Sequence, residues 1–307
     1  MKEVALRKEK MPLKRKLFII SVISIPILSF LFFYVYINFN SFLLAFQKID
    51  LAENYTFVGL DNFKNFFESI KNSDQAGLAL KNSIKNFWIT FLISTPLYIV
   101  FSYYIAKKMP GNKFVYGLVL MPSIVSAFLY ALCYKKFVEI SLMDIMRSMG
   151  VKNFPQLISH PDYCNFNNIF FSIWVSFGTS TLIFTNAINA VDKEILESAS
   201  VDGASDMVQF FKIVLPLIWP TLTTYVVTGL TGMLTWSGSL MTFYMYGAPS
   251  HIWGLGYYFT VTIKNTGAFG YMHYPMVATA GLFVTIVSTP LVFAIRHLMN
   301  KLDQTND

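Results

Sequence analysis

The stretch from Glu197 to Pro220 carries the side chains whose types and spacing could do chemistry with a partner. It reads ESASVDGASDMVQFFKIVLPLIWP, with small and acidic residues first, spaced apolar residues next and prolines near its end. The carboxylates of Glu197 and Asp202 can pair with basic side chains of another molecule. Ala199 and Ala204 keep the surface between them thin enough for close approach. This chemistry is that of a docking surface, and the residues offer no reaction.

Local rules predict a helix–turn–helix in this stretch. Asp192 can cap a helix that starts near Lys193, because its side-chain oxygen can accept a free amide hydrogen of the first turn. Gly203 falls where the chain must turn sharply, since glycine enters left-handed backbone conformations without steric cost. A second short helix is expected from about Ser205, and Pro216 marks its end or a kink. On these residues alone, an ordinary polar connection between two helices remains the alternative.

Motifs for catalysis, metal binding or nucleotide binding are absent from the sequence. It contains no GxSxG, HExxH or GxxxxGK[ST] motif. The four histidines are scattered, and Cys133 and Cys164 show no metal-ligand spacing. Both cysteines fall toward the expected outer side of a membrane, so a disulfide between them stays open. We expect no catalytic residue, metal or cofactor on this chain.

The composition is that of a membrane protein. Of the 307 residues, 54% are hydrophobic and only 13% are charged, far from the balance of a soluble domain. The net charge of +7 does not indicate nucleic-acid binding, because the basic residues form no face interleaved with aromatics. Seven of the 24 Lys and Arg residues precede the first hydrophobic run, which is typical of an orientation signal in a lipid bilayer.

Six apolar runs are long enough to span a bilayer, which takes about 20 residues. They predict an all-α integral membrane protein with helices at 17–38, 86–106, 114–134, 168–190, 221–243 and 275–295. The first run is too long for a signal peptide, and no cleavage site follows it. Prolines inside the runs predict kinks, and these prolines are Pro26, Pro96, Pro122 and Pro290.

The distribution of Lys and Arg predicts the orientation. With a cytoplasmic N-terminus, the inner segments hold 14 Lys and Arg in 65 residues and the outer segments hold 10 in 111. Lys135 and Lys136 oppose this assignment and are outweighed. We therefore expect a basic cytoplasmic N-terminus at 1–16, a six-helix membrane domain at 17–307, both termini in the cytoplasm and a cytoplasmic loop at 191–220.

None of the six runs contains a charged side chain. Intramembrane ionisable groups usually mark proton or ion pathways, so their absence argues against an ion-driven carrier. The two halves also lack the visible internal repeat of many secondary transporters. If the protein pumps a solute, the energy must come from a partner.

The Glu197 stretch resembles the cytoplasmic signature loop, or EAA motif, of the permease subunits of bacterial ABC importers. The one departure is Ser198, where that family usually has alanine. The resemblance implies that this loop inserts into a groove on the ATPase. It assigns coupling roles to Glu197, Ser198, Ala199, Asp202, Gly203, Ala204, Phe210, Ile213, Leu215 and Pro216. Of these, the apolar residues at 210, 213 and 215 would anchor the second short helix.

Other segments are similar to sugar permeases of the maltose-permease kind. They include FVGLDNF at 57–63, MPSIVSAFLYAL at 121–132, Trp174 and Gly178 ahead of 185–188, and YGAPS followed by GYMHYPMVATAGL at 270–282. This resemblance implies the type I ABC importer permease fold in the bacterial cytoplasmic membrane. It also implies a second permease subunit, an ABC ATPase dimer that holds ATP and Mg²⁺, and an extracellular solute-binding protein that delivers a sugar.

Candidate solute contacts are side chains that could hold a sugar by aromatic faces and hydroxyl hydrogen bonds. On the predicted fourth and fifth helices these are Thr179, Ser180, Thr235, Trp236 and Ser239. The same residue types also serve helix packing, by bonding back to helix carbonyls or by allowing close approach. The sequence does not decide between the two roles.

Three functions remain open at this stage. The first is the permease subunit of a sugar importer, and the second is an ABC permease for a non-sugar solute. The third is a membrane scaffold without transport, for which the Glu197 stretch would have no purpose. Neighbouring genes for a second permease, a solute-binding protein and glycoside hydrolases would favour the first.

Overall fold

The computed structural model describes residues 12–72, 74–151, 153–265 and 267–303. The chain is mostly helical, with one small β-hairpin in which β1 (Gln47–Ile49) pairs antiparallel with β2 (Tyr55–Phe57). The α-helices are α1 (Leu13–Ser29), α2 (Ile37–Leu44), α3 (Asp61–Asn72), α4 (Asp74–Ala106), α5 (Asn112–Ile124), α6 (Ala127–Lys136), α7 (Leu142–Ser148), α8 (Cys164–Asn189), α9 (Lys193–Val201), α10 (Asp206–Gln209), α11 (Leu215–Leu217), α12 (Trp219–Thr231), α13 (Leu240–Tyr244), α14 (Leu255–Asn265) and α15 (Tyr274–Lys301).

Short π-helical and 3₁₀ stretches join several of these helices. The π-helical stretches are η1 (Phe30–Tyr36), η2 (Phe137–Ser141) and η3 (Phe210–Val214), and the 3₁₀ stretches are η4 (Ser250–Ile252) and η5 (Gly267–His273). Through η1, α1 and α2 form one continuous helix, and through η3 the short α10 and α11 do the same.

Four helices of the described chain are long and apolar enough to cross a membrane by themselves. They are Leu13–Leu44, Gln75–Ala106, Cys164–Asn189 and Gly270–Lys301. The predicted helices at 17–38, 86–106, 168–190 and 275–295 are confirmed as helical, apart from Ala190, which caps α8. Two bent helix pairs raise the number of candidate spans to as many as six. The chain is a multi-pass membrane protein.

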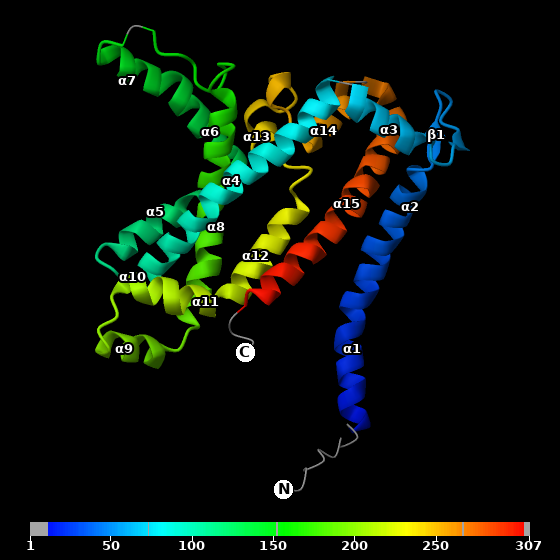
Figure 1. Cartoon of the computed structure of the whole chain (residues 1–307). Coiled ribbons are helices and arrows are strands. Elements are labelled where there is room, and N and C mark those ends of the chain that lie inside the picture. Colours follow the sequence, from blue (N-terminus) through cyan, green and yellow to red (C-terminus); the bar gives the residue numbers. More distant parts are fainter. Residues whose placement is uncertain (1–11, 73, 152, 266, 304–307) are drawn as a thin grey trace.

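The prediction of a single helix at 114–134 is wrong. α5 stops at Ile124, and the helix that follows from Ala127 is inclined to it by 106°. The break has a backbone cause, because Val125 is extended (φ −86°, ψ 147°) and Ser126 has the non-helical geometry of an N-cap. Pro122 in the last turn of α5 also lacks the amide hydrogen that would continue the ladder. Beyond the bend, α6 packs beside α8 and α13, and α7 leads outward from them (Figure 1).

The prediction of a single helix at 221–243 is also wrong. α12 ends at Thr231, residues 232–239 are not helical, and a separate short helix, α13, follows. Within this break Gly238 adopts φ +60°, which is not a helical conformation, and polar side chains from α4 and α8 take up the freed backbone groups. The Ser83 hydroxyl donates to the Trp236 carbonyl at 2.7 Å, and the Ser239 amide donates to the Asn168 side chain at 2.7 Å.

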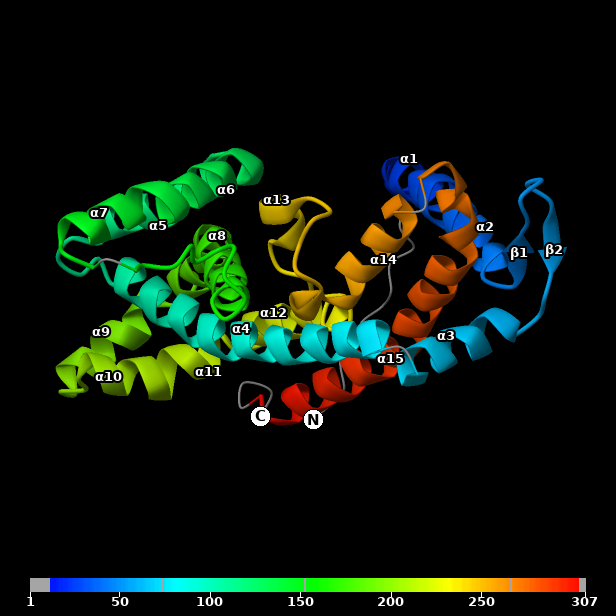
Figure 2. The same ribbon diagram turned by 90° about the horizontal axis from the view of Figure 1, so that it is seen from above.

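The long helices pack in two groups, and segments of both groups meet at one end of the molecule. α4 and α5 pack on α8, whereas α12, α2 and α3 pack on α15. In Figure 1 the start of α1, the end of α15 and the α9–α11 region all lie at the lower end, and Figure 2 shows α5–α8 and α1–α3 on opposite sides. No residue of α1 is buried within the described chain.

The close contact between α5 and α8 generates a test at Gly178. A Cβ added at Gly178 would lie 2.7 Å from the Val119 carbonyl oxygen and 2.8 Å from the Ser123 hydroxyl. We expect Gly178→Ala to destabilise the protein by about 1–3 kcal/mol through overpacking. In the matched control Gly117→Ala, on α5 itself, the added Cβ meets nothing within 4 Å. That control should be neutral or stabilising by up to about 1 kcal/mol. Thermal unfolding in detergent measures both, and equal transition temperatures would contradict the packing.

Candidate functional site

The α9–α11 hairpin, residues 192–217, forms from local signals. The Asp192 side chain accepts from the Glu194 amide at 3.0 Å and caps α9. The helix ends in a Schellman motif, in which the Ala204 amide donates to the Ala199 carbonyl and the Gly203 amide donates to the Ser200 carbonyl. Gly203 has φ +80°, so the predicted cap and the predicted left-handed turn are both confirmed.

The second arm of the hairpin runs from the cap Ser205 through α10, η3 and α11 to Leu217. The Asp206–Leu217 helix and α12 are bent by 66° at Ile218. Pro216 therefore lies near the end of this arm, as predicted. The bend separates the hairpin from the membrane helix that follows it.

The second arm is anchored by an apolar cluster. Phe210 is 7% exposed, and its ring centroid lies 5.0 Å from that of Tyr103 on α4. Val214 and Ile218 are also buried there, against residues of α4 and α8 that are Tyr98, Ile99, Tyr103, Phe184 and Ile188. Of the other predicted anchors, Leu215 packs at the edge of this cluster and Ile213 is half-buried. Sequence reasoning missed Val214 and Ile218 as anchors. Their spacing at intervals of four residues from Phe210 places all three on one helix face, and this pattern could have revealed them.

The opposite face of the hairpin is exposed. Glu197, Ser198, Asp202 and Gly203 are exposed, whereas Ala199, Ala204 and Pro216 are half-buried. Apolar side chains also stand out among these polar residues, with Val201 88%, Met207 66% and Phe211 57% exposed. Exposed apolar side chains gathered beside a polar turn favour contact with another protein.

A polar cluster that sequence reasoning missed joins the hairpin to α4. Lys107, directly after α4, forms an ion pair with Asp206 and donates to the Gln209 side-chain oxygen at 2.9 Å. The Gln209 amide in turn donates to the Ser200 hydroxyl at 3.0 Å and to the Ala204 carbonyl at 2.9 Å. Burial lowers the pKa of Lys107, but Asp206 and Tyr103 together outweigh it and raise that pKa above its ordinary value.

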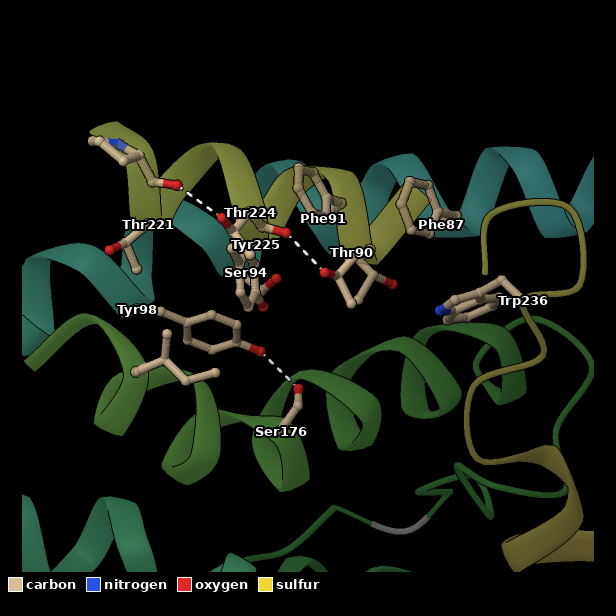
Figure 3. Close-up of a pocket in the computed structure, with 14 residues that line it drawn as sticks. Phe87, Thr90, Phe91, Ser94, Tyr98, Ser176, Thr221, Thr224, Tyr225 and Trp236 are labelled. Atoms are coloured by element: carbon tan, nitrogen blue, oxygen red, sulfur yellow. Dashed lines mark hydrogen bonds between the residues drawn. The ribbon is translucent and has the colours of Figure 1, made fainter. Parts of the chain in front are cut away.

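A cavity of about 620 Å³ lies between α4, α8 and α12. Its lining residues are Phe87, Thr90, Phe91, Ser94, Tyr98, Ser176, Ile183, Pro220, Thr221, Thr224, Tyr225, Thr228, Gly229 and Trp236. Figure 3 shows Trp236 at one end of the cavity and Thr221 at the other, with Tyr98, Ser94 and Tyr225 between them. The lining combines aromatic rings with hydroxyl groups and includes no charged side chain.

Hydroxyl groups of the lining differ in how they are satisfied. The Tyr98 hydroxyl is 2.7 Å from that of Ser176, and Thr224 and Thr228 bond back to carbonyls of α12. The Thr90 hydroxyl is buried and has no hydrogen-bond partner in the described chain.

The predicted solute contacts are placed apart from one another. Trp236 alone among the five lines the 620 Å³ cavity, while Ser180 is buried behind it with its hydroxyl 3.1 Å from that of Tyr225. Thr179 is exposed and is not part of the lining. Thr235 lines a second cavity of about 430 Å³ beside α14 and α15. The Ser239 hydroxyl lies 3.2 Å from that of Ser172. Neither Thr235 nor Trp236 lies on a helix, because both fall in the 232–239 break.

The missed lining residues carry a visible sequence signal. On α4 the hydroxyl residues Thr90, Ser94 and Tyr98 recur at intervals of four, beside Phe87 and Phe91. Residues four apart share one helix face, so this polar stripe within an apolar run indicates a helix face turned to a cavity. The cysteines are not joined: Cys133 is exposed and free, and Cys164 is buried and free.

Known proteins resemble this chain over most of its length, although no protein-family model matches it. It is 30% identical over 232 residues to the probable ABC transporter permease protein YesP of Bacillus subtilis (strain 168), covering 71% of this chain and 70% of YesP. It is 27% identical over 208 residues to the arabinooligosaccharides transport system permease protein AraP of the same organism. That match covers 66% of this chain, which spans 64% of the length of AraP.

The fold is that of a solved ABC transporter. A bacterial ABC transporter involved in the import of the acidic polysaccharide alginate has a chain that superposes with a TM-score of 0.75 at 20% identity, covering 95% of this chain and 98% of its own length. A second structure of an alginate transporter, in complex with an alginate pentasaccharide-bound periplasmic protein, gives a TM-score of 0.73 at 21% identity. Together with the identity to YesP over more than two thirds of both proteins, these findings show that the chain belongs to the family of ABC transporter permeases.

Proposed function

We propose that this permease, with a second permease subunit, forms the pathway by which an ATP-driven importer takes up a sugar or oligosaccharide delivered by an extracellular solute-binding protein. The observation that carries the proposal is the α9–α11 hairpin. Its exposed face combines carboxylates with apolar side chains, and its buried face packs on the same α4 and α8 that line the cavity. A protein docked on the hairpin is therefore mechanically connected to the cavity.

The docking partner on the hairpin is an ABC ATPase. The chain has no phosphate-binding loop, so ATP and Mg²⁺ belong to that partner. Its contacts are the residues around the turn, which are Glu197, Ser198, Ala199, Asp202, Gly203 and Ala204. The second arm transmits the force, because Phe210 and Val214, with Leu215 at the edge, pack it on α4 and α8. Ile213 and Pro216 lie on the same arm and are assigned to the same coupling role.

The hairpin and both termini face the cytoplasm of the bacterial cell. The higher density of Lys and Arg on the proposed inner segments supports this orientation. The start of α1, the end of α15 and the hairpin also lie at one end of the molecule (Figure 1). Six spans follow if each bent pair crosses the membrane once, with a basic segment at 1–16 ahead of the membrane domain at 17–307.

A second permease fits the exposure of the long helices. All large apolar side chains from Leu13 through Phe42 are exposed in the single chain. The cavity is lined by residues of three helices and one loop segment. A second subunit would cover part of this surface and close the pathway, and lipid would cover the rest. The second alginate transporter structure contains an alginate pentasaccharide-bound periplasmic protein, which supports the same kind of delivery here.

The solute is a neutral carbohydrate. Aromatic faces of Trp236, Tyr225 and Tyr98 offer flat apolar contact to the carbon–hydrogen face of a sugar ring, and the surrounding hydroxyls offer hydrogen bonds. An acidic sugar such as the alginate of the solved relative would need a cation, and the lining contains none. A charged solute would be costly in such a site.

Gly203 provides the test of ATPase docking. Because its φ is +80°, Gly203→Val adds backbone strain of about 1–2 kcal/mol and a side chain at the docking surface. We expect a loss of roughly tenfold in affinity for the ATPase, measured by co-purification and by ATP hydrolysis of the complex. Gly150→Val is the matched control, since Gly150 has φ +89° and equally open surroundings in the loop after α7. Undiminished association of the Gly203 variant would remove the docking role.

The solute assignment is tested on the solute-binding protein and on Trp236. The purified binding protein is titrated with arabinotriose, maltotriose and a charged trigalacturonate, and we expect binding of a neutral sugar only. Trp236→Ala should then weaken uptake of that sugar about 2–10-fold, the size of a lost aromatic contact, with partial recovery in Trp236→Phe. Binding of the uronate alone would contradict the neutral lining as the selective feature. Binding of no sugar would end the carbohydrate assignment and leave the ABC assignment intact.

A further inference from the structure

The polar cluster of Lys107, Asp206 and Gln209 sits where three helices meet. Lys107 follows the last residue of α4, Asp206 is the first residue of α10, and Gln209 lies one turn later. The side chain of Lys107 is 23% exposed and that of Asp206 is 57% exposed, while Gln209 is only 2% exposed. The cluster is therefore not a solvated surface pair, because one of its members is enclosed by protein.

Some hydrogen bonds of the cluster join the parts of the hairpin to one another, and others join the hairpin to the end of α4. Gln209 donates to Ser200 on α9 and to the Ala204 carbonyl in the turn, and it accepts from Lys107. The Tyr103 hydroxyl on α4 donates to the Asp206 carbonyl at 3.0 Å. Both arms of the hairpin and its turn are thus fastened to one another and to the end of α4.

The two charges suit the helix ends on which they stand. A cation is favoured near the carboxyl end of a helix and an anion near the amino end, because of the helix dipole. Lys107 follows α4 and Asp206 opens α10, so the ion pair also complements both dipoles. The position of Lys107 is fixed by a tight turn in which Lys108 has φ +53° and the Met109 amide donates to the Tyr104 carbonyl.

The connection from the hairpin to α12 is of another kind. The chain bends by 66° at Ile218, and Pro216 and Pro220 on either side lack the amide hydrogens that would carry a helix ladder across. α12 is fastened elsewhere, since the Trp219 indole donates to the Met299 carbonyl of α15 at 2.8 Å. Among the described residues, the contacts of α12 with α4 and α8 are apolar apart from one hydroxyl pair between Tyr225 and Ser180. Tyr225 lies against aromatic rings, Leu222 packs at the edge of the apolar cluster, and Leu230 is buried with Phe87.

We propose that Lys107, Asp206 and Gln209 form a latch that fixes the α9–α11 hairpin to α4, so that the two move as one body against α12 about the bend at Ile218. The cavity lies between α4 and α12, and such a motion changes its width. That an ATPase drives the motion rests on the proposed function. The latch residues position the hairpin and have no direct contact with the cavity lining in this arrangement.

The first experiment is a double-mutant cycle in the assembled complex of both permeases and the ATPase. Lys107→Ala, Asp206→Ala and the double variant are compared with Lys108→Ala, which removes the same charge one residue away.

Because the latch obliges α4 to move with the hairpin, breaking the latch should let the ATPase hydrolyse ATP without moving α4. We expect ATP hydrolysis without solute-binding protein to rise roughly threefold in each single variant, the scale of a partly exposed ion pair. The double variant should exceed neither single variant. Multiplying effects, or an equal rise in Lys108→Ala, would overturn the latch.

The second experiment measures the rigid body itself. Spin labels at Lys193→Cys on α9 and Leu97→Cys on α4 are introduced after Cys133→Ser and Cys164→Ala, and their distance distribution is recorded with and without ATP and vanadate. In the labelled protein with the intact latch, we expect one narrow distance distribution that does not change with nucleotide. In Lys107→Ala we expect a broader distribution that shifts with nucleotide. A shift already present with the latch intact, or no broadening in Lys107→Ala, would overturn the proposal.

The two proposals fail in different ways. If the ATPase does not co-purify with the chain that carries the intact latch, ATPase docking on the hairpin is wrong. The width of the spin-label distribution in the full-length chain without ATPase still judges the latch, because Lys107→Ala should broaden it and Lys108→Ala should not.

Discussion

Backbone polar groups that lose their helix partners are costly inside a bilayer, and the arrangement of this permease depends on how its broken helices satisfy them. Beside the cavity, residues 232–239 are not helical, and the chain from α13 to α14 is also largely irregular. Ser83 donates to the Trp236 carbonyl and accepts from the Leu255 amide, while Asn82 donates to two carbonyls of the same region. On α8, the Asn168 side chain donates to the Ser237 carbonyl and accepts from the Ser239 amide. These few side chains hold Trp236 at the end of the cavity without a helix.

Sequence reasoning succeeds where local chemistry decides the structure. The cap at Asp192, the turn at Gly203 and the start of the second short helix near Ser205 depend on neighbouring residues only, and the four long spans depend on sustained apolar composition. It failed at 114–134 and 221–243, because hydropathy reports burial in lipid and says nothing of helix continuity. The side chain that stabilises the second break, Ser83, lies 153 residues from Trp236 in the sequence, so no local pattern could reveal it. The cavity lining on α4 did leave a pattern, in the hydroxyls spaced by four.

Helix α4 contacts both the cavity and the hairpin. Its middle part contributes Phe87, Thr90, Ser94 and Tyr98 to an uncharged lining, and its last turns carry Tyr103 against Phe210 of the hairpin. Tyr98 belongs to both regions, because it lines the cavity and also packs in the apolar cluster that anchors the hairpin. The cavity lining and the hairpin contact are therefore joined on one helix.

Helix α1, the first part of the long helix Leu13–Leu44, stands apart from this arrangement, because none of its residues is buried by its own chain, whereas α2 packs on α15. Its helical hydrogen bonds are satisfied internally, so it needs no other part of the protein in order to exist in lipid. Whatever packing free energy it contributes is realised only between molecules. Substitutions on this helix should accordingly leave the isolated chain intact and show themselves in the yield of the assembled transporter, which makes α1 a reporter of quaternary structure.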